Sequence, residues 1–298
     1  MWRCKLLPCF AMIFFTTIAF VAPEQTTGPN PRPLLRQVDH ILIEAADTRK
    51  LFDFLTETLR LPIAWPLTEY PGFSSGGASA GNVNIEVLSY SLPRGARPAR
   101  RPAARFIGLA LEPLRLTDCL AELQVRGVPH DPPEPHISKL PDGSLGTLWT
   151  NVGLPRLSDA GLSVFLCEYS SSFLHAEIRR NQLGGQLALR KGGPLGVRSV
   201  KEVVVTTTDL ARCRSEWERL SIVESASPAG MLPVGNGPAI RLVPASTNRI
   251  QRIVLKVNAL KPARDFLEKN RLLGAASAGE VTIAPATIQG LGIRLVEE

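Results

Sequence analysis

The order of structural elements repeats along this chain of 298 residues, and that repeat limits the fold more than any other feature. The run VDHILIE, residues 38–44, alternates side chains as a strand does. Residues 47–59 then carry an apolar stripe at helical spacing, and VNIEVLSY, residues 83–90, has the composition of another strand. Between them lie residues 63–65 and a Gly- and Ser-rich stretch, residues 73–81, which we interpret as strand and turn. The order of the unit is therefore βαβββ.

The same order recurs three more times. The later units begin with the runs FIGLALE at residue 106, VKEVVVT at residue 200 and IQRIVLKV at residue 250. The predicted N-caps support this alignment, because Asp47 and Asp209 each lie seven residues beyond equivalent strand positions, His40 and Glu202. One such unit cannot bury both faces of its sheet, so the units are expected to pair. We predict an α+β fold of four βαβββ modules paired into two eight-stranded curved sheets, each with helices outside and a concave face inside.

The repeat also divides the chain into segments. We expect modules 1 and 2 to form one domain and modules 3 and 4 to form another. The predicted segments are 1–35 for an N-terminal signal or anchor with its linker, 36–170 for the first domain, 171–198 for a second linker, and 199–298 for the second domain. Within the second linker we predict a short helix over residues 173–181 and turns over residues 184–196.

The N-terminus has the pattern of an export signal. Arg3 and Lys5 precede an apolar run, residues 6–21, that is too short for a comfortable membrane span. The cleavage site is poor, because Phe20 occupies a position that prefers a small residue and Pro23 lies close by. Retention as an uncleaved anchor therefore stays open. We expect an exported protein, periplasmic or extracellular, with no membrane contact other than this segment.

The formal net charge of +7 does not indicate a nucleic-acid partner, because the basic residues are scattered. The exception is RGARPARRPAAR, residues 94–105, whose Pro and Ala content favours a solvated linker. Beyond the leader the cysteines are Cys119, Cys167 and Cys213, and their spacing fits neither a zinc ribbon nor a disulfide-rich scaffold. We expect these three to be buried as small apolar side chains.

Two polar residues interrupt the apolar strands of the first unit. Strict alternation places Val38, His40 and Leu42 on one face of the first strand and Asp39 on the other. We expect His40 and Glu86 to point to the inner, concave face. A buried carboxylate is costly unless it is paired or coordinates a metal, so Glu86 requires a partner.

The run VDHILIE with its helix and the later GNVNIEVLSY resemble the vicinal-oxygen-chelate superfamily, which includes glyoxalase I, extradiol dioxygenases, epimerases and fosfomycin-resistance proteins. In that superfamily a first-strand His and a fourth-strand Glu of paired modules bind a divalent metal. The resemblance implies that His40 and Glu86 are metal ligands. It also implies a third ligand, Glu168 in FLCEY, at the matching position of the second unit, where Gly108 stands in place of a first-strand His.

A set of one His and two carboxylates is compatible with manganese, iron(II), zinc or magnesium, and a metal-free cup stays open as well. The resemblance implies a metal-dependent enzyme of the lyase or isomerase type, rather than a dioxygenase, acting on a small oxygenated substrate. Glu86 or Glu168 would serve as general base. The alternative is a metal-free small-molecule-binding protein of the bleomycin-resistance type. With four modules in one chain, a monomer suffices, and a homodimer is the other expectation.

The second half has different side chains at the matching positions. These are Glu202 and Arg241 in the third unit and Arg252 and Arg294 in the fourth. Three guanidiniums and one carboxylate do not form a cation site. We therefore expect the second pair of modules to be structural or to bind an anion.

Further candidates surround the first site. The proline-rich loop over residues 129–144 is long enough to be a lid or binding loop. Its candidate side chains are His130, His136 and Lys139, and candidates outside it are Asn82, Asn84, Trp149 and Tyr169. We interpret the two aromatic residues as apolar walls of a pocket.

Overall fold

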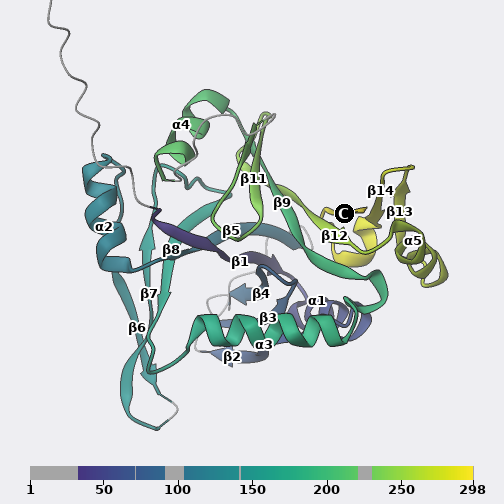
Figure 1. The fold of residues 1–298 in the computed structure, drawn as a ribbon, viewed down its shortest axis with the longest axis horizontal. Coiled ribbons are helices and arrows are strands. Elements are labelled where there is room, and N and C mark those ends of the chain that lie inside the picture. Colours follow the sequence, from purple (N-terminus) through teal and green to yellow (C-terminus); the bar gives the residue numbers. More distant parts are fainter. Residues whose placement is uncertain (1–32, 71, 91–103, 141, 221–229, 298) are drawn as a thin grey trace, which may run out of the picture. The chain divides into compact units, whose positions relative to one another are not determined.

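The computed structural model describes residues 33–70, 72–90, 104–140, 142–220 and 230–297 (Figure 1). The predicted export signal and the Arg-rich stretch up to residue 103 lie outside these residues, as do Cys4 and Cys9. Within the part that is described, no helix combines the length and the apolar character needed to cross a membrane.

The four predicted modules correspond to the observed element order. Module 1 contains β1 (Leu35–Ala45), α1 (Thr48–Asp53) with a π-helical turn η1 (Phe54–Thr58), β2 (Ile63–Tyr70), β3 (Phe73–Ser79) and β4 (Asn84–Tyr90). Module 2 contains β5 (Ala104–Pro113), α2 (Leu116–Val125), β6 (Glu134–Lys139), β7 (Leu145–Gly153) and β8 (Ser163–Tyr169). The connection contains α3 (Ala176–Leu189) and η2 (Gly193–Leu195). Module 3 contains β9 (Val197–Thr207), α4 (Leu210–Leu220), β10 (Met231–Leu232) and β11 (Ala239–Pro244). Module 4 contains β12 (Arg249–Val257), α5 (Leu260–Lys269), β13 (Leu273–Ala276), β14 (Glu280–Ile283), η4 (Pro285–Ile288) and β15 (Ile293–Glu297).

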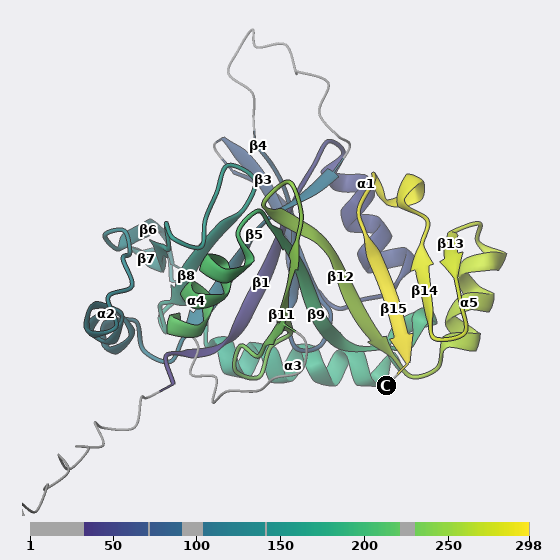
Figure 2. The same ribbon diagram turned by 90° about the horizontal axis from the view of Figure 1, so that it is seen from above.

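The modules pair as predicted, and the α+β fold class is confirmed. Modules 1 and 2 form an eight-stranded sheet in the order β2-β3-β4-β1-β5-β8-β7-β6. Modules 3 and 4 form a sheet with seven described strands in the order β10-β11-β9-β12-β15-β14-β13. In each sheet the two modules meet where their first strands pair antiparallel, β1 with β5 and β9 with β12 (Figure 2). The two sheets therefore repeat one plan.

The predicted helix caps are confirmed. The Asp47 carboxylate accepts a hydrogen bond from the Lys50 backbone N–H at 2.9 Å, and Asp209 accepts one from the Arg212 N–H at 3.0 Å. Each bond satisfies one of the free N–H groups of a first helical turn. The helices α1 and α4 therefore begin at equivalent places in modules 1 and 3.

Each of the four first strands contains a β-bulge with one extra residue at an equivalent place. In the antiparallel β1–β5 pair these residues are Asp39 and Ile107, and in the β9–β12 pair they are Lys201 and Gln251. A further register shift occurs near one end of each pair, at Arg36 in β1 and at Arg198 in β9. Each of the four equivalent bulges lies immediately before one of the positions that the sequence comparison of the modules singled out. The bulge is thus a shared part of the plan, and it was not predicted from the sequence.

The bulge at Asp39 corrects the expected faces of β1. Leu42 belongs to the small concave apolar cluster, whereas Val38 packs into the main core on the opposite face. The pairing partners step from Val38–Leu111 to His40–Ala110, so Asp39 is the residue in excess. Asp39 consequently faces the concave side together with His40, where strict alternation had put it on the far side.

The Gly- and Ser-rich stretch is strand β3 for most of its length rather than a turn. A β-carbon on Gly77 would lie 2.5 Å from the Trp65 ring, and one on Gly76 would lie 2.8 Å from the Phe52 ring. Gly76 and Gly77 therefore give two large aromatic side chains room to pack against β3. Because these two residues have no side chain, the aromatic rings can lie close to the β3 backbone, which stays extended.

The connecting helix α3 is longer than the predicted residues 173–181 and contains the predicted turns at Gly184 and Gly185. Its Leu183 and Leu187, one helical turn apart, are buried. The helix contacts both β3 and β9, and Figure 2 shows it running alongside both sheets. Burial of this apolar edge outweighs the low helix propensity of two glycines.

One main apolar core extends through both sheets, and residues 32–298 form one compact unit. The Asn82 side chain joins the sheets, since it donates to the Val200 carbonyl at 3.0 Å and accepts from the Val200 N–H at 2.9 Å. Cys119 and Cys167 are buried and Cys213 is half-buried, and none of the three forms a disulfide with another described residue. The domain boundaries given above stay predictions.

Candidate functional site

A cavity of about 800 Å³ lies on the concave face of the first sheet. Aromatic side chains form much of its wall, with Trp65 from β2, Trp149 from β7, and Phe165 and Tyr169 from β8. The two predicted wall residues, Trp149 and Tyr169, are therefore in place. The cavity has the size and mixed lining expected of a small-molecule site.

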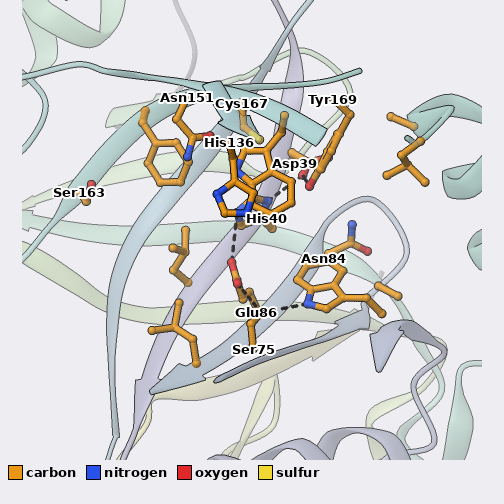
Figure 3. Close-up of a pocket in the computed structure, with 18 of the residues that line it drawn as sticks. Asp39, His40, Ser75, Asn84, Glu86, His136, Asn151, Ser163, Cys167 and Tyr169 are labelled. Atoms are coloured by element: carbon orange, nitrogen blue, oxygen red, sulfur yellow. Dashed lines mark hydrogen bonds and ion pairs between the residues drawn. The ribbon is translucent and has the colours of Figure 1, made fainter. Parts of the chain in front are cut away.

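His40 lies at the centre of a hydrogen-bonded group in this cavity (Figure 3). Its Nδ1 is 2.7 Å from Asp39 Oδ2, and its Nε2 is 3.3 Å from Glu86 Oε2. The Tyr169 hydroxyl donates to the same Asp39 oxygen at 3.1 Å. The bulge and strand β4 thus bring two carboxylates to the two ring nitrogens of one buried histidine.

The second oxygen of Glu86 is held as well. Ser75 Oγ donates to Glu86 Oε1 at 2.6 Å, and Trp65 Nε1 donates to Ser75 Oγ at 3.0 Å. Figure 3 shows Glu86 between Ser75 and His40. The partner that sequence analysis required for Glu86 is therefore His40 together with Ser75.

The electrostatic environment shifts the pKa values of this group. Burial lowers the pKa of His40, but the Asp39 hydrogen bond and the charges of Glu86 and Asp39 raise it, and the net pKa lies above its ordinary value. Burial and the Asp39 charge raise the pKa of Tyr169 well above its usual range. Tyr169 therefore stays a hydrogen-bond donor, and the imidazolium form of His40 is favoured because its positive charge lies between two carboxylates.

Strand register shows which residues of module 2 match His40 and Glu86. In module 1, His40 pairs with Asn84 and Leu42 with Glu86; in module 2, Gly108 pairs with Ser163 and Ala110 with Phe165. The match of Glu86 is therefore Phe165, while Gly108 keeps the position given to it by the sequence.

This register corrects the place assigned to Glu168, which lies three residues beyond Phe165. An odd step along a strand leads to the opposite face. There Glu168 Oε1 accepts a hydrogen bond from the Leu116 backbone N–H at 2.8 Å, at the start of α2. The structure brings His40 and Glu86 together and does not bring Glu168 to them.

The residues present do not make a complete set of protein ligands for a divalent metal. A β-carbon at Gly108 would lie 2.6 Å from the Ser163 carbonyl oxygen, so the position of the missing His has no room for a side chain. In the described ranges, no group of three or more His, Cys, Asp or Glu side chains is arranged to hold a metal ion. Metal binding by His40, Glu86 and Glu168 stays a prediction.

The other candidates divide between the cavity and the surface. Within residues 129–144, His136 lines the cavity and stacks on Trp149 with ring centroids 4.2 Å apart, whereas His130 and Lys139 are not among the cavity residues. Part of the predicted loop is strand β6. Asn84 lines the cavity, but Asn82 does not.

The cavity residues that were not identified from the sequence include Asp39, Trp65, Ser75 and Asn151. Asn151 Oδ1 is buried and has no hydrogen-bond donor among the described protein groups. An unpaired buried acceptor is costly, and a ligand that donates a hydrogen bond would satisfy it. No sequence signal marked Asp39, because a bulge is defined by pairing between strands that are distant in sequence.

Solved structures show what this fold resembles. A hypothetical protein from Staphylococcus aureus has a TM-score of 0.58 at 14% identity, with 88% of this chain and 99% of that chain covered. A 4-hydroxymandelate synthase mutant from Streptomyces coelicolor has a TM-score of 0.58 at 12% identity, with 89% and 93% covered. A homoprotocatechuate 2,3-dioxygenase variant from Brevibacterium fuscum has a TM-score of 0.55 at 13% identity, with 90% and 72% covered.

These likenesses show a fold of the vicinal-oxygen-chelate type, as the sequence resemblance implied. At this level of identity they show the fold alone. No protein-family model matches the chain, and no curated protein matches it.

Proposed function

We propose that this chain is a vicinal-oxygen-chelate enzyme whose first cavity binds a small oxygenated molecule and moves a proton at one of its oxygens through His40. The observation that carries the proposal is the buried Asp39–His40–Glu86 group in a cavity with aromatic walls. General acid–base chemistry needs a titratable group at hydrogen-bond distance from the reacting atom, held in a fixed orientation.

The neighbours of His40 give it that orientation. Trp65 and Phe165 both meet the imidazole edge-on, with ring centroids 6.1 Å away in each case. Asp39 holds Nδ1, so Nε2 is the nitrogen that is shared between Glu86 and a ligand. A hydroxyl placed beside Nε2 would exchange a proton with the imidazole, while the aromatic walls exclude water.

Asn151 and the aromatic walls indicate the kind of ligand. Flat apolar walls suit a ring or another planar group. The buried Asn151 Oδ1 suits a hydroxyl or amide donor on that group. The similar structures include an enzyme named for homoprotocatechuate, a benzene ring with two vicinal hydroxyls and a carboxymethyl group, and we take that compound as a probe.

Isothermal titration of the full chain with homoprotocatechuate, after treatment with a chelator, tests the proposal. We expect saturable binding that His40→Asn weakens at least about tenfold, since it removes the ring contacts of Nε2. The matched control is His130→Asn, a half-buried histidine that does not line the cavity. Binding that His40→Asn leaves unchanged would contradict the role of His40.

A metal-dependent enzyme is the second candidate, and one distance favours it. The 3.3 Å between His40 Nε2 and Glu86 Oε2 is the separation of two ligands on one divalent ion, with Asp39 supporting Nδ1. His40 and Glu86 would hold the ion, which would polarise a substrate oxygen. Metal analysis of the purified chain decides: about one divalent ion per chain, lost in His40→Asn and Glu86→Gln, would select this candidate over the first.

A further inference from the structure

The second sheet carries a cluster of arginines at the same strand positions as the first cavity. Arg241 pairs with Val204, and Val204 pairs with Arg252, so the two arginines lie in one row across β11, β9 and β12. In the next row Glu202 pairs with Val254, and Val254 pairs with Arg294, across β9, β12 and β15. Figure 2 shows these four strands side by side.

The strand register shows which four positions of the second sheet are equivalent to the four positions of the first. His40, Glu86, Gly108 and Phe165 correspond to Glu202, Arg241, Arg252 and Arg294 in that order. Residues at alternate positions of neighbouring strands face the same side of a sheet. The four positions of the second sheet therefore share one face, and three of them carry a positive charge.

Two of the arginines have carboxylate partners. Arg241 contacts Glu202 Oε2 through Nε at 2.8 Å and Nη2 at 2.7 Å, and Arg294 Nη1 is 2.7 Å from Glu280 Oε2. Arg252 has no ion pair with any residue in the described ranges, and its Nη1 donates to the neutral Gln251 side chain at 2.7 Å. The cluster thus holds three cations against two anions.

Two N–H donors of the arginine cluster lack a hydrogen-bond acceptor among the described residues. The Nε atoms of Arg252 and Arg294 are buried, and no acceptor in the described part of the chain reaches either one. Burial, followed by the nearby Arg294 charge, lowers the pKa of Arg252. Two guanidiniums that are close enough to affect one another therefore keep unpaired donors, which costs free energy unless an acceptor arrives.

We propose that this arginine face binds a small oxyanion, a phosphate or carboxylate group, through Arg252 and Arg294. A guanidinium presents planar N–H donors that match the oxygens of such a group. One anionic group would supply acceptors to both Nε atoms and would neutralise the excess positive charge. Solvent reaches the face, since the Arg241 and Arg294 side chains are 31% and 29% exposed.

The site is separate from the first cavity, because none of the four residues lines that cavity. Its charge also excludes the chemistry proposed for the first sheet, since guanidiniums repel a metal ion and do not exchange protons at physiological pH. The inference therefore holds whether or not the first cavity acts through His40.

Titration of the full chain with inorganic phosphate, against chloride at the same ionic strength, tests the proposal. We expect saturable binding by calorimetry and a phosphate-dependent rise in Tm. Arg252→Gln is expected to weaken phosphate binding at least about tenfold. Arg264→Gln makes the same charge change at an exposed position of helix α5, outside the arginine face, and is expected to leave binding unchanged.

Glu202→Gln provides a test of opposite sign. Removing this negative charge leaves the cluster more positive, so phosphate is expected to bind about threefold to tenfold more tightly. Circular dichroism verifies that each variant is folded, and the gain expected for Glu202→Gln is not something that misfolding produces. The proposal is overturned if the native chain shows no saturable phosphate binding, or if Arg252→Gln binds as tightly as Arg264→Gln.

Discussion

The two sheets share a backbone plan and differ in what four equivalent positions carry. In the first sheet, His40 and Glu86 meet beside Gly108, and an aromatic cavity lies above them. In the second, Glu202 and Arg241 form an ion pair at the positions of His40 and Glu86. The positions of Gly108 and Phe165 are taken by two further arginines.

The bulge and the register define places for side chains, and the chemistry at those places varies independently of the backbone plan. Both sheets keep a contact between the first and second of these places, as a His–Glu pair or as a Glu–Arg pair. The third place differs most in the size of its side chain. Gly108 adds no side chain to the cavity floor, whereas Arg252 fills the same place with a long one.

Breaking the ion pair of the second sheet is expected to have the largest effect on stability. Arg241→Ala leaves Glu202, whose side chain is 8% exposed, without its cation. Removing one partner of a buried pair is strongly destabilising, and with Arg241 partly exposed we expect a loss of about 2 to 3 kcal/mol. Denaturant unfolding measures it. The double variant with Glu202→Ala is expected to lose less than Arg241→Ala alone; an equal or greater loss would contradict this role for the pair.

Adding a side chain at the third place of the first sheet is expected to have the next largest effect. Gly108→Val puts a β-carbon 2.6 Å from the Ser163 carbonyl oxygen, which forces β5 and β8 apart. Overpacking of this kind costs about 2 kcal/mol. Thermal unfolding measures it, with Gly184→Ala as control, because a β-carbon there meets nothing within 4 Å. A fully stable Gly108→Val chain would show that the two sheets tolerate side chains equally.

The helix caps are expected to be equivalent in the two halves. Asp47→Ala and Asp209→Ala each remove one side-chain hydrogen bond to a first-turn N–H, so each is expected to cost about 1 kcal/mol. Denaturant unfolding of the two variants is the measurement. A loss in one variant only would show that the modules differ in how their helices start.

The smallest expected effect is a difference in alkylation rate between the thiols of Cys119 and Cys213. Burial raises the pKa of Cys119 to about 12 and also raises the pKa of Cys213, which is less buried. The thiolate is the reactive form, so alkylation by iodoacetamide is expected to be slow in both and to speed up about tenfold per pH unit at neutral pH. Site-resolved mass spectrometry should find Cys213 faster than Cys119. Faster labelling of Cys119 would indicate local opening of the first half.

The repeated order of elements and the starts of helices α1 and α4 could be predicted from the sequence. Asp47 and Asp209 are local signals, because an N-cap is defined by residues next to one another in the chain. His40 and Glu86 were also predictable, since each places a polar group in an apolar strand. These features depend on short stretches of sequence, so they can be recognised without knowledge of how distant strands pair.

Features that depend on pairing between distant strands were not predictable. Asp39 faces the cavity only because β5 has one residue fewer across from it, and the register of β8 puts Phe165 where Glu168 was expected. The helical conformation of Gly184 likewise depends on contacts of α3 with β3 and β9. In all three cases tertiary structure overrides the local pattern.

Gly108 also limits which substitutions the concave face of the first sheet accepts. A side chain at residue 108 requires the Ser163 carbonyl to move as well, because a β-carbon there would lie 2.6 Å from the carbonyl oxygen. Placing a new functional side chain at residue 108 therefore needs two coordinated changes, of which the first alone destabilises the chain. A redesign of this site succeeds more readily at the three other equivalent positions.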